Sequence, residues 1–391
     1  MQNILDYLHW RGDLSFARDD LNEVDNLIFS ILSYLEYDRY FSDVTGDQPL
    51  PLRQVAEILT AARDANAPKE KRPQFKQIPD LLTRAARSQR YGKVGVSSFI
   101  NQINEDISEQ FCAMVFSINP KLHYIAFRGT DDTLAGWKED FQMSFMDEVP
   151  AQKQAVLYTR QVLQKLAGDF YLGGHSKGGN LAVYAAAHTS PAMRERILAV
   201  YNNDGPGFQS KIIQSDGYQS IVDRVSTYIP RSSIVGLLLE HGEAYKVVGS
   251  SALALLQHDG FSWKVAGRQF VIEEDFSRGN LVFNEALRVW LKQISYEQRA
   301  LFVDAMFEII QASGARKLGD LSREKLVAAR AMINTYKNMD AETREQLKKV
   351  IELFFTESQK IIKTSLSAEI DSFIAAKLKR KKKSVQETGQ A

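Results

Sequence analysis

The segment DFYLGGHSKGGNLAVYAAAH, residues 169–188, limits the possible folds of this chain more than any other. A short apolar run leads into paired glycines around Ser176, and an alanine-rich run follows. This pattern predicts a buried strand, a sharp turn and a helix. The backbone of such a turn is strained, so the residues two before and two after the serine must lack a Cβ. Gly174 and Gly178 meet that requirement, and the segment therefore predicts a strand–turn–helix unit of an α/β protein.

Short apolar runs and helical segments alternate through the middle of the chain. The runs at 111–118 and 122–129 predict two strands joined by a tight turn, and residues 151–168 have the apolar spacing of a helix. Further strands are expected at 197–204, 224–230 and 245–251, with an outer strand or hairpin at 262–275. The alternation predicts an α/β fold with a mainly parallel sheet and helices on both faces.

The ends of the chain are predicted to be helical additions to this core. Helical spacing is found at 22–37, over most of 51–90, at 295–314 and at 341–379. We therefore expect four parts: an N-terminal, mainly helical segment packed on the core (1–108), the α/β core (109–280), a C-terminal helical region (281–376) and a basic, disordered tail (377–391).

Charge and composition exclude several classes of protein. The chain has 49 Lys and Arg against 48 Asp and Glu, so no overall positive field is available to attract nucleic acid. Cys112 is the single cysteine, which excludes an internal disulfide and suits a reducing compartment. Neither a secretory signal nor a bilayer-spanning run is apparent, so a cytoplasmic location is expected. The chain has no cluster with metal-ligand spacing and no phosphate-binding loop, so no cofactor is predicted.

The basic run KLKRKKK at 377–383 has two interpretations. Lys and Arg side chains are favourable at the negative end of a helix dipole, so the run can be a solvated helix end. The alternative is a weak contact with an anionic membrane surface. The sequence indicates no oligomeric state.

The turn itself fits the G-x-S-x-G pattern of a nucleophile elbow, with Ser176 as the candidate nucleophile. The following helix would direct its N-terminal N–H groups and dipole toward the serine oxygen. Acyl transfer also needs two backbone N–H donors for the developing oxyanion. Lys177 would supply one donor, and Thr130, in the polar turn after the strand YIAFRG, would supply the other. The alternatives are a glycine-rich turn without chemistry, and a strand-end turn in which Asp131 or Asp132 caps the next helix.

Together, the two segments IAFRGT and GHSKGGNLA resemble the class 3, fungal-type lipase branch of the α/β-hydrolases. That branch has an FRGT-like segment, a W-x-x-D motif, which Trp137 and Asp140 match, and GHSLGGALA. The resemblance covers roughly residues 110–265, and the whole chain is similar to a bacterial lipase-like family of unknown function. Lys177 replaces the usual leucine, which would put an ammonium group beside the nucleophile at the entrance for the acyl group.

The candidate bases come from six histidines: His9, His123, His175, His188, His241 and His258. The first two precede the motif, His175 is expected to point away from the reacting face, and His188 lies about three helical turns from the serine. A base must arrive on a loop above the sheet, and His258 follows the last predicted parallel strand. We favour His258, which the resemblance also supports, over His241 or a structural role for both.

Three residues compete for the acid of the triad. Asp204 ends the predicted strand ILAVYNND, where a carboxylate can reach a histidine on a neighbouring loop. Class 3 lipases carry the acid one strand later, and the matching segment RSSIVG has Ser233 in its place. Glu240 is the third candidate. We favour Asp204, whose alternative role is to stabilise the Gly-Pro-Gly bend that follows it.

The leading functional hypothesis is a cofactor-independent serine hydrolase that cleaves an ester of a lipid-like or otherwise hydrophobic acyl group. Its reaction would use Ser176, His258 and Asp204, with the N–H groups of Thr130 and Lys177 as the oxyanion hole. The alternative is a catalytically silent hydrolase fold that acts as a binding or scaffold module through its C-terminal helices.

Overall fold

In the computed structural model, eight strands form one sheet whose spatial order follows the chain from β1 to β8. The structure describes residues 2–35, 37, 48–61, 76–131, 133–276, 285–286, 289–291, 293–313, 325–353, 356 and 359. The strands are β1 (Leu50–Pro51), β2 (Gly95–Asn104), β3 (Glu109–Asn119), β4 (Leu122–Phe127), β5 (Asp169–His175), β6 (Ile197–Asn203), β7 (Val225–Pro230) and β8 (Tyr245–Val248). Pairing is antiparallel from β1 to β4 and parallel from β4 to β8. The expected α/β sheet, mainly parallel, is confirmed.

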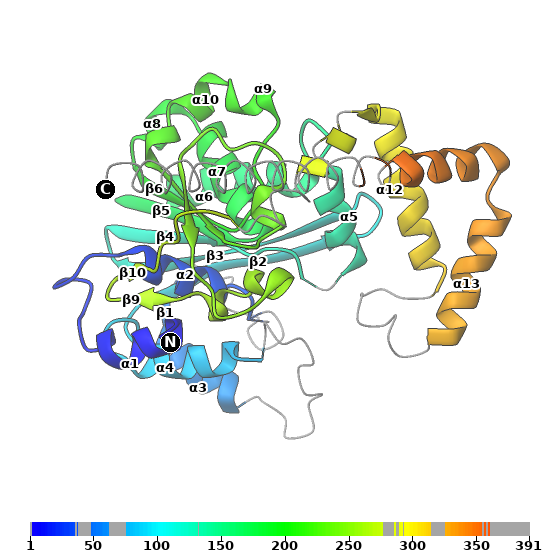
Figure 1. The fold of residues 1–391 in the computed structure, drawn as a ribbon. Helices are drawn as coiled ribbons and strands as arrows, with labels where there is room; N and C mark the ends of the chain where they lie inside the picture. Colours follow the sequence, from blue (N-terminus) through cyan, green and yellow to red (C-terminus); the bar gives the residue numbers. More distant parts are fainter. Residues whose placement is uncertain are drawn as a thin grey trace, which may run out of the picture.

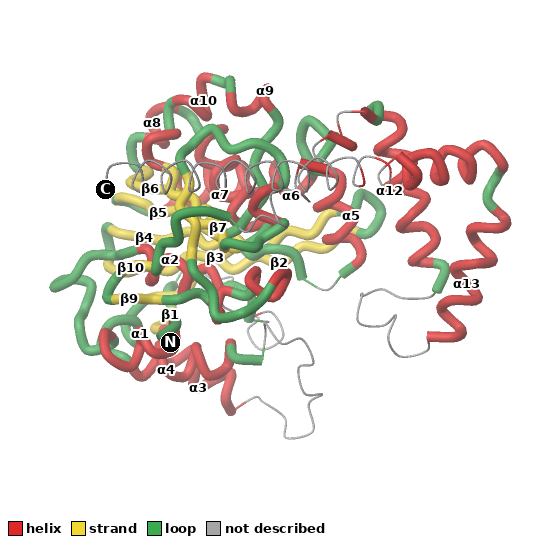
Figure 2. Tube along the Cα trace, viewed as in Figure 1, coloured by secondary structure: helices red, strands yellow, loops and turns green. Residues whose placement is uncertain are grey.

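Helices cover both faces of this sheet, as the sequence predicts (Figures 1 and 2). One layer contains α1 (Ile4–Arg11), α2 (Glu23–Leu32), α3 (Leu52–Ala61) and α4 (Ile78–Arg87). The other contains α6 (Pro150–Lys165) and α7 (Lys177–His188), with the short helices α8 (Pro191–Arg194), α9 (Ser210–Ile213) and α10 (Asp216–Gln219). The segment between β4 and α6 forms α5 (Leu134–Gln142), which borders the candidate site.

Strand β3 explains why the sheet needs a layer on each side. Its sequence EQFCAMVFSIN is apolar on both faces, so simple alternation with polar residues is absent. Phe111 and Val115 belong to the cluster with α6 and α7, whereas Met114 and Phe116 belong to the cluster with α1 to α4. A strand that is apolar on both faces is stable only when both faces are covered.

Strand β2, which lies in the segment 1–108, is not among the strands that the sequence predicts. Its residues GVSSFINQIN mix polar and apolar side chains, and the register with β3 shifts between Ser97 and Ile100. That irregularity breaks the alternation by which a half-buried strand is recognised. The pairing with β3, over eight residue pairs, is a tertiary feature that the local pattern does not reveal.

The C-terminal region contains a predicted helix that the structure confirms. Helix α12 (Tyr296–Gln311) starts at Ser295, whose side chain and Gln298 form the expected capping box. Helix α13 (Lys325–Asn338) follows, and residues 341–353 are also helical. Figure 1 shows α12 and α13 beyond α5, outside the two layers that sandwich the sheet. The rest of the predicted helix to 379 and the basic tail at 377–391 lie outside the described residues.

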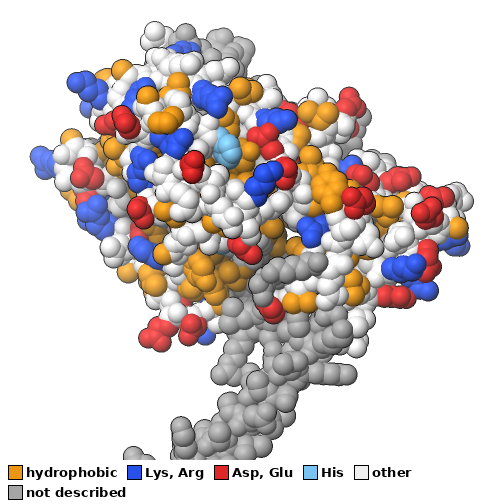
Figure 3. All heavy atoms as spheres, turned by 90° about the horizontal axis from the view of Figure 1, so that it is seen from above, with side chains coloured by type: hydrophobic (Ala, Val, Ile, Leu, Met, Phe, Trp, Pro, Cys, Tyr) orange, Lys and Arg blue, Asp and Glu red, His pale blue; other side chains and the backbone are white. Residues whose placement is uncertain are grey.

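The predicted hairpin near residue 265 is present as the short strands β9 (Val265–Ala266) and β10 (Gln269–Phe270). On the face shown in Figure 3, basic and acidic side chains are interspersed, in keeping with the net charge of +1. None of the helices that the structure describes has both the length and the apolar character needed to cross a membrane.

Candidate active site

Ser176 lies on a sharp turn between the end of β5 and the start of α7. Its backbone has φ 59° and ψ −136°, a strained conformation for a residue with a side chain. The Ser176 N–H donates to the Asn203 carbonyl at 2.9 Å, which ties the turn to the neighbouring strand. A Cβ on Gly174 would come within 2.3 Å of the Gly178 backbone, and one on Gly178 within 2.1 Å of the Phe127 carbonyl oxygen. Both glycines are therefore required by close backbone approach, and the predicted elbow geometry is present.

His258 ends a 3-10 helix (Ala254–His258) on the loop after β8 and contacts Asp204 at the end of β6. The distance from His258 Nδ1 to Asp204 Oδ2 is 2.6 Å. The Asp204 side chain is fully buried, and its other oxygen accepts the Gly236 N–H at 3.1 Å. Burial raises the pKa of Asp204, while hydrogen bonds from His258, Ser233 and the Gly236 N–H and the charge of His258 act in the opposite direction.

The other two acid candidates have different partners. Ser233 is buried and hydrogen bonds to Asp204 itself. Glu240 is exposed and accepts a hydrogen bond from the Ser210 hydroxyl at 3.0 Å. His241, the alternative base, pairs with the buried Glu243 at 3.1 Å. Of the three acid candidates, the one that reaches the His258 ring is Asp204.

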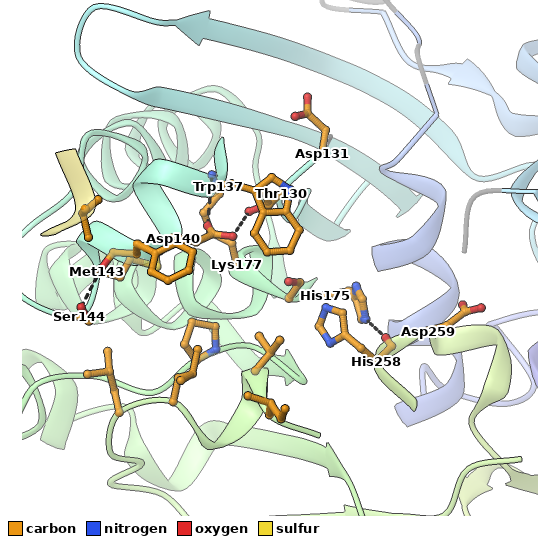
Figure 4. Close-up of a pocket in the computed structure, with 18 of the residues that line it drawn as sticks. Thr130, Asp131, Trp137, Asp140, Met143, Ser144, His175, Lys177, His258 and Asp259 are labelled. Carbon is orange, nitrogen blue, oxygen red and sulfur yellow. Dashed lines mark hydrogen bonds and ion pairs between the residues drawn. The ribbon is translucent and has the colours of Figure 1, made fainter. Parts of the chain in front are cut away.

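His175 does not point away from the site, which corrects the expectation from the sequence. Its Nε2–H donates to the His258 carbonyl oxygen at 2.7 Å, and the two imidazole rings lie 4.6 Å apart (Figure 4). Nδ1 then accepts from the Tyr34 hydroxyl at 3.2 Å. Burial, with a smaller contribution from the charge of His258, lowers the pKa of His175 to about 3, so this ring is neutral at physiological pH.

Tyr34 is a site residue that sequence reasoning missed. It follows α2, within a segment whose apolar spacing indicated only a core helix. Its hydroxyl also lies where a Cβ on Gly129 would be, at 2.2 Å, so it touches both the loop of Thr130 and the elbow. Nothing in the local pattern indicates that this tyrosine reaches residues more than 90 positions away.

Thr130 and Lys177 both line the cavity that contains Ser176. The Thr130 hydroxyl donates to Asp140 Oδ2 at 2.5 Å. A Cβ on the preceding Gly129 would lie 2.9 Å from the Ser176 Cβ, so the two turns are in close contact. The N-cap of α5 is Thr133, and Asp131 accepts the Thr133 N–H at 2.8 Å; Asp132 lies outside the described residues.

The Lys177 side chain is buried beneath the elbow, contrary to the expected ammonium at the acyl entrance. Its Nζ donates to Glu139 Oε2 at 2.7 Å and to the Gln110 carbonyl at 2.9 Å, and both charged side chains are fully buried. Glu139 also accepts the backbone N–H groups of Gln110 and Ala151. Glu139 lies in α5, Gln110 in β3 and Ala151 in α6, so one buried ion pair joins three elements to the start of α7.

Asp140 stands next to this pair. Its Oδ1 is 3.8 Å from Lys177 Nζ and has no hydrogen-bond partner among the described residues. Burial raises the pKa of Asp140 to about 6, against the opposing effects of Lys177 and of the hydrogen bond from Thr130. The sequence pointed to Asp140 through the W-x-x-D motif but gave no reason to single out Glu139.

A cavity of about 590 Å³ opens above Ser176 and His258. Its lining is mainly apolar and comes from α2, α5, the loop 234–239, the His258 loop and the C-terminal region, as Figure 4 shows in part. Thr130, Ser176 and His258 are among the polar residues of this lining. An apolar cavity with a few convergent polar groups is the usual form of a site for a small ligand.

Comparisons with known proteins give a family and distant structural likenesses. A family model described as Mbeg1-like matches residues 85–308, more than half of the chain. No curated protein matches the sequence significantly. Among solved structures, the M37 lipase is 14% identical over 54% of this chain and 68% of its own, with a TM-score of 0.34. A fungal lipase in complex with an inhibitor is 14% identical over 44% and 69%, with a TM-score of 0.31.

A third structure, a mutant of MDLA from Penicillium cyclopium, is 13% identical over 63% of this chain and 82% of its own, with a TM-score of 0.37. At these values the likeness is distant. The case for chemistry at Ser176 therefore depends on the geometry of the site.

Proposed function

The chain belongs to the Mbeg1-like family, and from this premise we propose that it is a serine hydrolase that cleaves esters of hydrophobic acyl groups. The observation that carries the proposal is the 2.6 Å hydrogen bond between His258 and the buried Asp204, beside a serine on a strained elbow in the same cavity. A strained serine and a carboxylate-bound imidazole that share a cavity are what a serine nucleophile and its base require.

The proposed reaction starts at Ser176. His258 takes the proton from the serine hydroxyl through Nε2, because the Asp204 carboxylate holds a proton on Nδ1. The serine oxygen attacks the acyl carbon, and the N–H groups of Thr130 and Lys177 stabilise the oxyanion that forms. His258 then protonates the leaving alcohol. Water attacks the acyl-enzyme with His258 as base, which releases the acid and restores Ser176.

The neutral state of His175 supports this assignment of roles. A second imidazolium 4.6 Å from His258 would oppose the positive charge that the base acquires during the reaction. The low pKa of His175 removes that repulsion, and its bond to the His258 carbonyl holds the base loop in place. Within the described residues, Ser176 makes no hydrogen bond to His258, and such bonds commonly tighten only when substrate binds.

Labelling by a fluorophosphonate probe tests the proposal, together with hydrolysis of p-nitrophenyl butyrate. We expect the wild type to label and to hydrolyse the ester. Ser176→Ala should lose labelling and reduce kcat by at least about 10³-fold, because the nucleophile is gone. The matched control is Ser210→Ala, which removes an exposed hydroxyl outside the cavity and should behave like the wild type. A wild type that neither labels nor hydrolyses any ester would overturn the proposal and leave the scaffold hypothesis.

A further inference from the structure

One wall of the candidate active site comes from outside the α/β sheet. Trp290, Ile294, Phe302 and Val303 of the C-terminal region line the same cavity as Ser176, and we call them the α12 wall. Trp290, Ile294 and Val303 are buried, and Phe302 is half-buried. The Trp290 indole N–H donates to the Val350 carbonyl at 2.9 Å, and its ring packs edge-on against Phe302. The indole is thus satisfied within the protein and adds an apolar surface to the cavity.

Helix α12 is fixed against α5, the helix that follows the loop of Thr130. Arg299 donates to the Ser144 carbonyl at 3.1 Å, and Lys138 pairs with Asp304 at 2.8 Å. Edge-on ring contacts join Phe141 to Phe307 and Phe145 to Tyr296. Val303 belongs to a small buried cluster with Leu134, Phe145 and Phe307. The wall is therefore part of a packed interface on the α5 side of the cavity.

The proposed chemistry decides which half of the substrate faces this wall. His258 must protonate the leaving alcohol, so the alcohol lies on the His258 side of the acyl carbon. The acyl chain then extends in the other direction, past Thr130. In Figure 4, His258 and Asp259 lie on one side of Lys177, and Met143 and Ser144 lie on the other. Because α12 contacts the Ser144 carbonyl, the acyl chain points toward the α12 wall.

The side toward the α12 wall has the apolar character that this orientation requires. Toward the α12 wall, the cavity adds Trp137, Phe141 and Met143 from the α5 segment. The guanidinium of Arg299, which also lines this side, donates to the backbone carbonyls of Ser144, Ile294 and Leu291, so its donors are directed at the protein. On the His258 side, Asp259 and Tyr34 line the cavity together with the apolar residues Ile31 and Leu256. An uncharged, apolar chain fits the side toward the α12 wall.

We infer that the α12 wall is the acyl-chain subsite and that Phe302 and Val303 set the length of chain the protein accepts. This inference rests on the proposed function. It assigns esters of neutral, extended acyl chains as the substrate class. A helical region that the α/β sheet does not need thereby acquires a role in specificity.

The test compares kcat/KM for p-nitrophenyl butyrate, octanoate and palmitate in the wild type and in two wall variants. The wild type should prefer a chain longer than butyrate. Val303→Trp fills the subsite, and the ratio of octanoate to butyrate kcat/KM should fall at least about tenfold, since one methylene in an apolar pocket changes this constant about 10- to 200-fold. Phe302→Ala enlarges the subsite and should shift preference toward palmitate. Phe302→Ala also provides a second test of the subsite if Val303→Trp fails to fold.

Two controls separate the possible failures. Glu308→Trp places the same bulk on an exposed position of α12 and should leave the chain-length profile unchanged. Leu256→Trp, on the His258 side, should change discrimination between alcohol groups attached to one acyl chain. If the wild type cleaves esters but neither wall variant changes the profile, the acyl subsite is wrong while the proposed function stands. If the wild type cleaves none of the esters, the proposed function is wrong and this inference falls with it.

Discussion

The two sides of Ser176 are built on different physical principles. On the side of the proposed base, which we call the base side, hydrogen bonds link Tyr34, His175, His258 and Asp204, and the His258 side chain is 29% exposed. On the side of the proposed oxyanion donors, which we call the oxyanion side, Thr130 binds Asp140, and Asp140 lies beside the Lys177–Glu139 ion pair. Neither side chain of that ion pair has any exposed surface. One side presents an ionisable ring to the cavity, and the other contains a fully buried ion pair.

This difference matches what each side must do in the proposed reaction. A base gains and loses a proton in every cycle, so it needs access to substrate and water. Oxyanion donors only have to stay in place, because their contribution comes from being oriented before the charge develops. A buried ion pair with further hydrogen bonds is suited to rigid placement, since removal of either partner leaves an unpaired buried charge. We therefore expect changes on the base side to affect rate, and changes on the oxyanion side to affect stability first.

The largest expected effect is on the base side. Asp204→Asn keeps the shape of the side chain but no longer favours the proton on His258 Nδ1, so kcat for an activated ester should fall about 10⁴-fold. Thermal unfolding should be unchanged or shifted slightly upward, because burial already raises the pKa of Asp204 and the neutral amide avoids burying a charge. A large loss of stability with kcat preserved would contradict the expectation that changes on the base side affect rate.

The next effect is on the oxyanion side and concerns the free energy of unfolding. Lys177→Met removes the ammonium and leaves the Glu139 carboxylate buried without its partner, which should destabilise the protein by about 3–5 kcal/mol in urea titrations. The Lys177 backbone N–H is retained, so the folded fraction should keep most of its activity.

The double variant Lys177→Met/Glu139→Gln provides the control for that substitution. It removes both charges, and the amide introduced at position 139 keeps an oxygen that can accept one of the backbone N–H groups now bound by Glu139. Part of the lost stability should return. If the double variant is no more stable than Lys177→Met, the ion pair does not hold the elbow, and the contrast between the two sides is lost.

The smallest expected effect is the pH dependence of the stability that Asp140 contributes on the oxyanion side. Burial raises the pKa of Asp140 from its ordinary value of 3.8 to about 6, so between these values the folded state keeps a proton that the unfolded state has lost. The stability contributed at this position therefore falls as pH rises from about 4 to about 6. The side chain keeps 26% exposure, which limits the change to roughly 1–2 kcal/mol.

Comparison with Asp140→Asn isolates this contribution. The variant has no carboxyl to titrate, so its stability relative to the wild type should increase by that amount across the same pH interval. Urea midpoints measured at several pH values provide the test. Parallel curves for the two proteins would show that Asp140 does not titrate in this range.

Local sequence was sufficient for the elements that carry the site. Strand β5, the turn and α7 were predicted because the requirement for Gly174 and Gly178 arises within a few residues of Ser176. The hairpin at β9 and β10 and the start of α12 at Ser295 were predicted for the same reason, since turns and caps are short-range features. Strand β2 was missed because its irregular register depends on its partner β3.

The sequence by itself determined that this chain forms an α/β sheet with a serine on a strained turn, because strand, helix and turn propensities act over a few residues. Only the tertiary structure decided which of the three acid candidates meets the His258 ring, since Asp204 follows β6, Ser233 and Glu240 lie between β7 and β8, and the approach of these segments to His258 depends on sheet packing. Packing likewise decided that Lys177 turns inward to Glu139 and that α12 closes the cavity beside α5. A buried charge is stable only where a group of opposite charge and further hydrogen bonds are available to it. For Lys177 that group is Glu139, which lies 38 residues away in the chain.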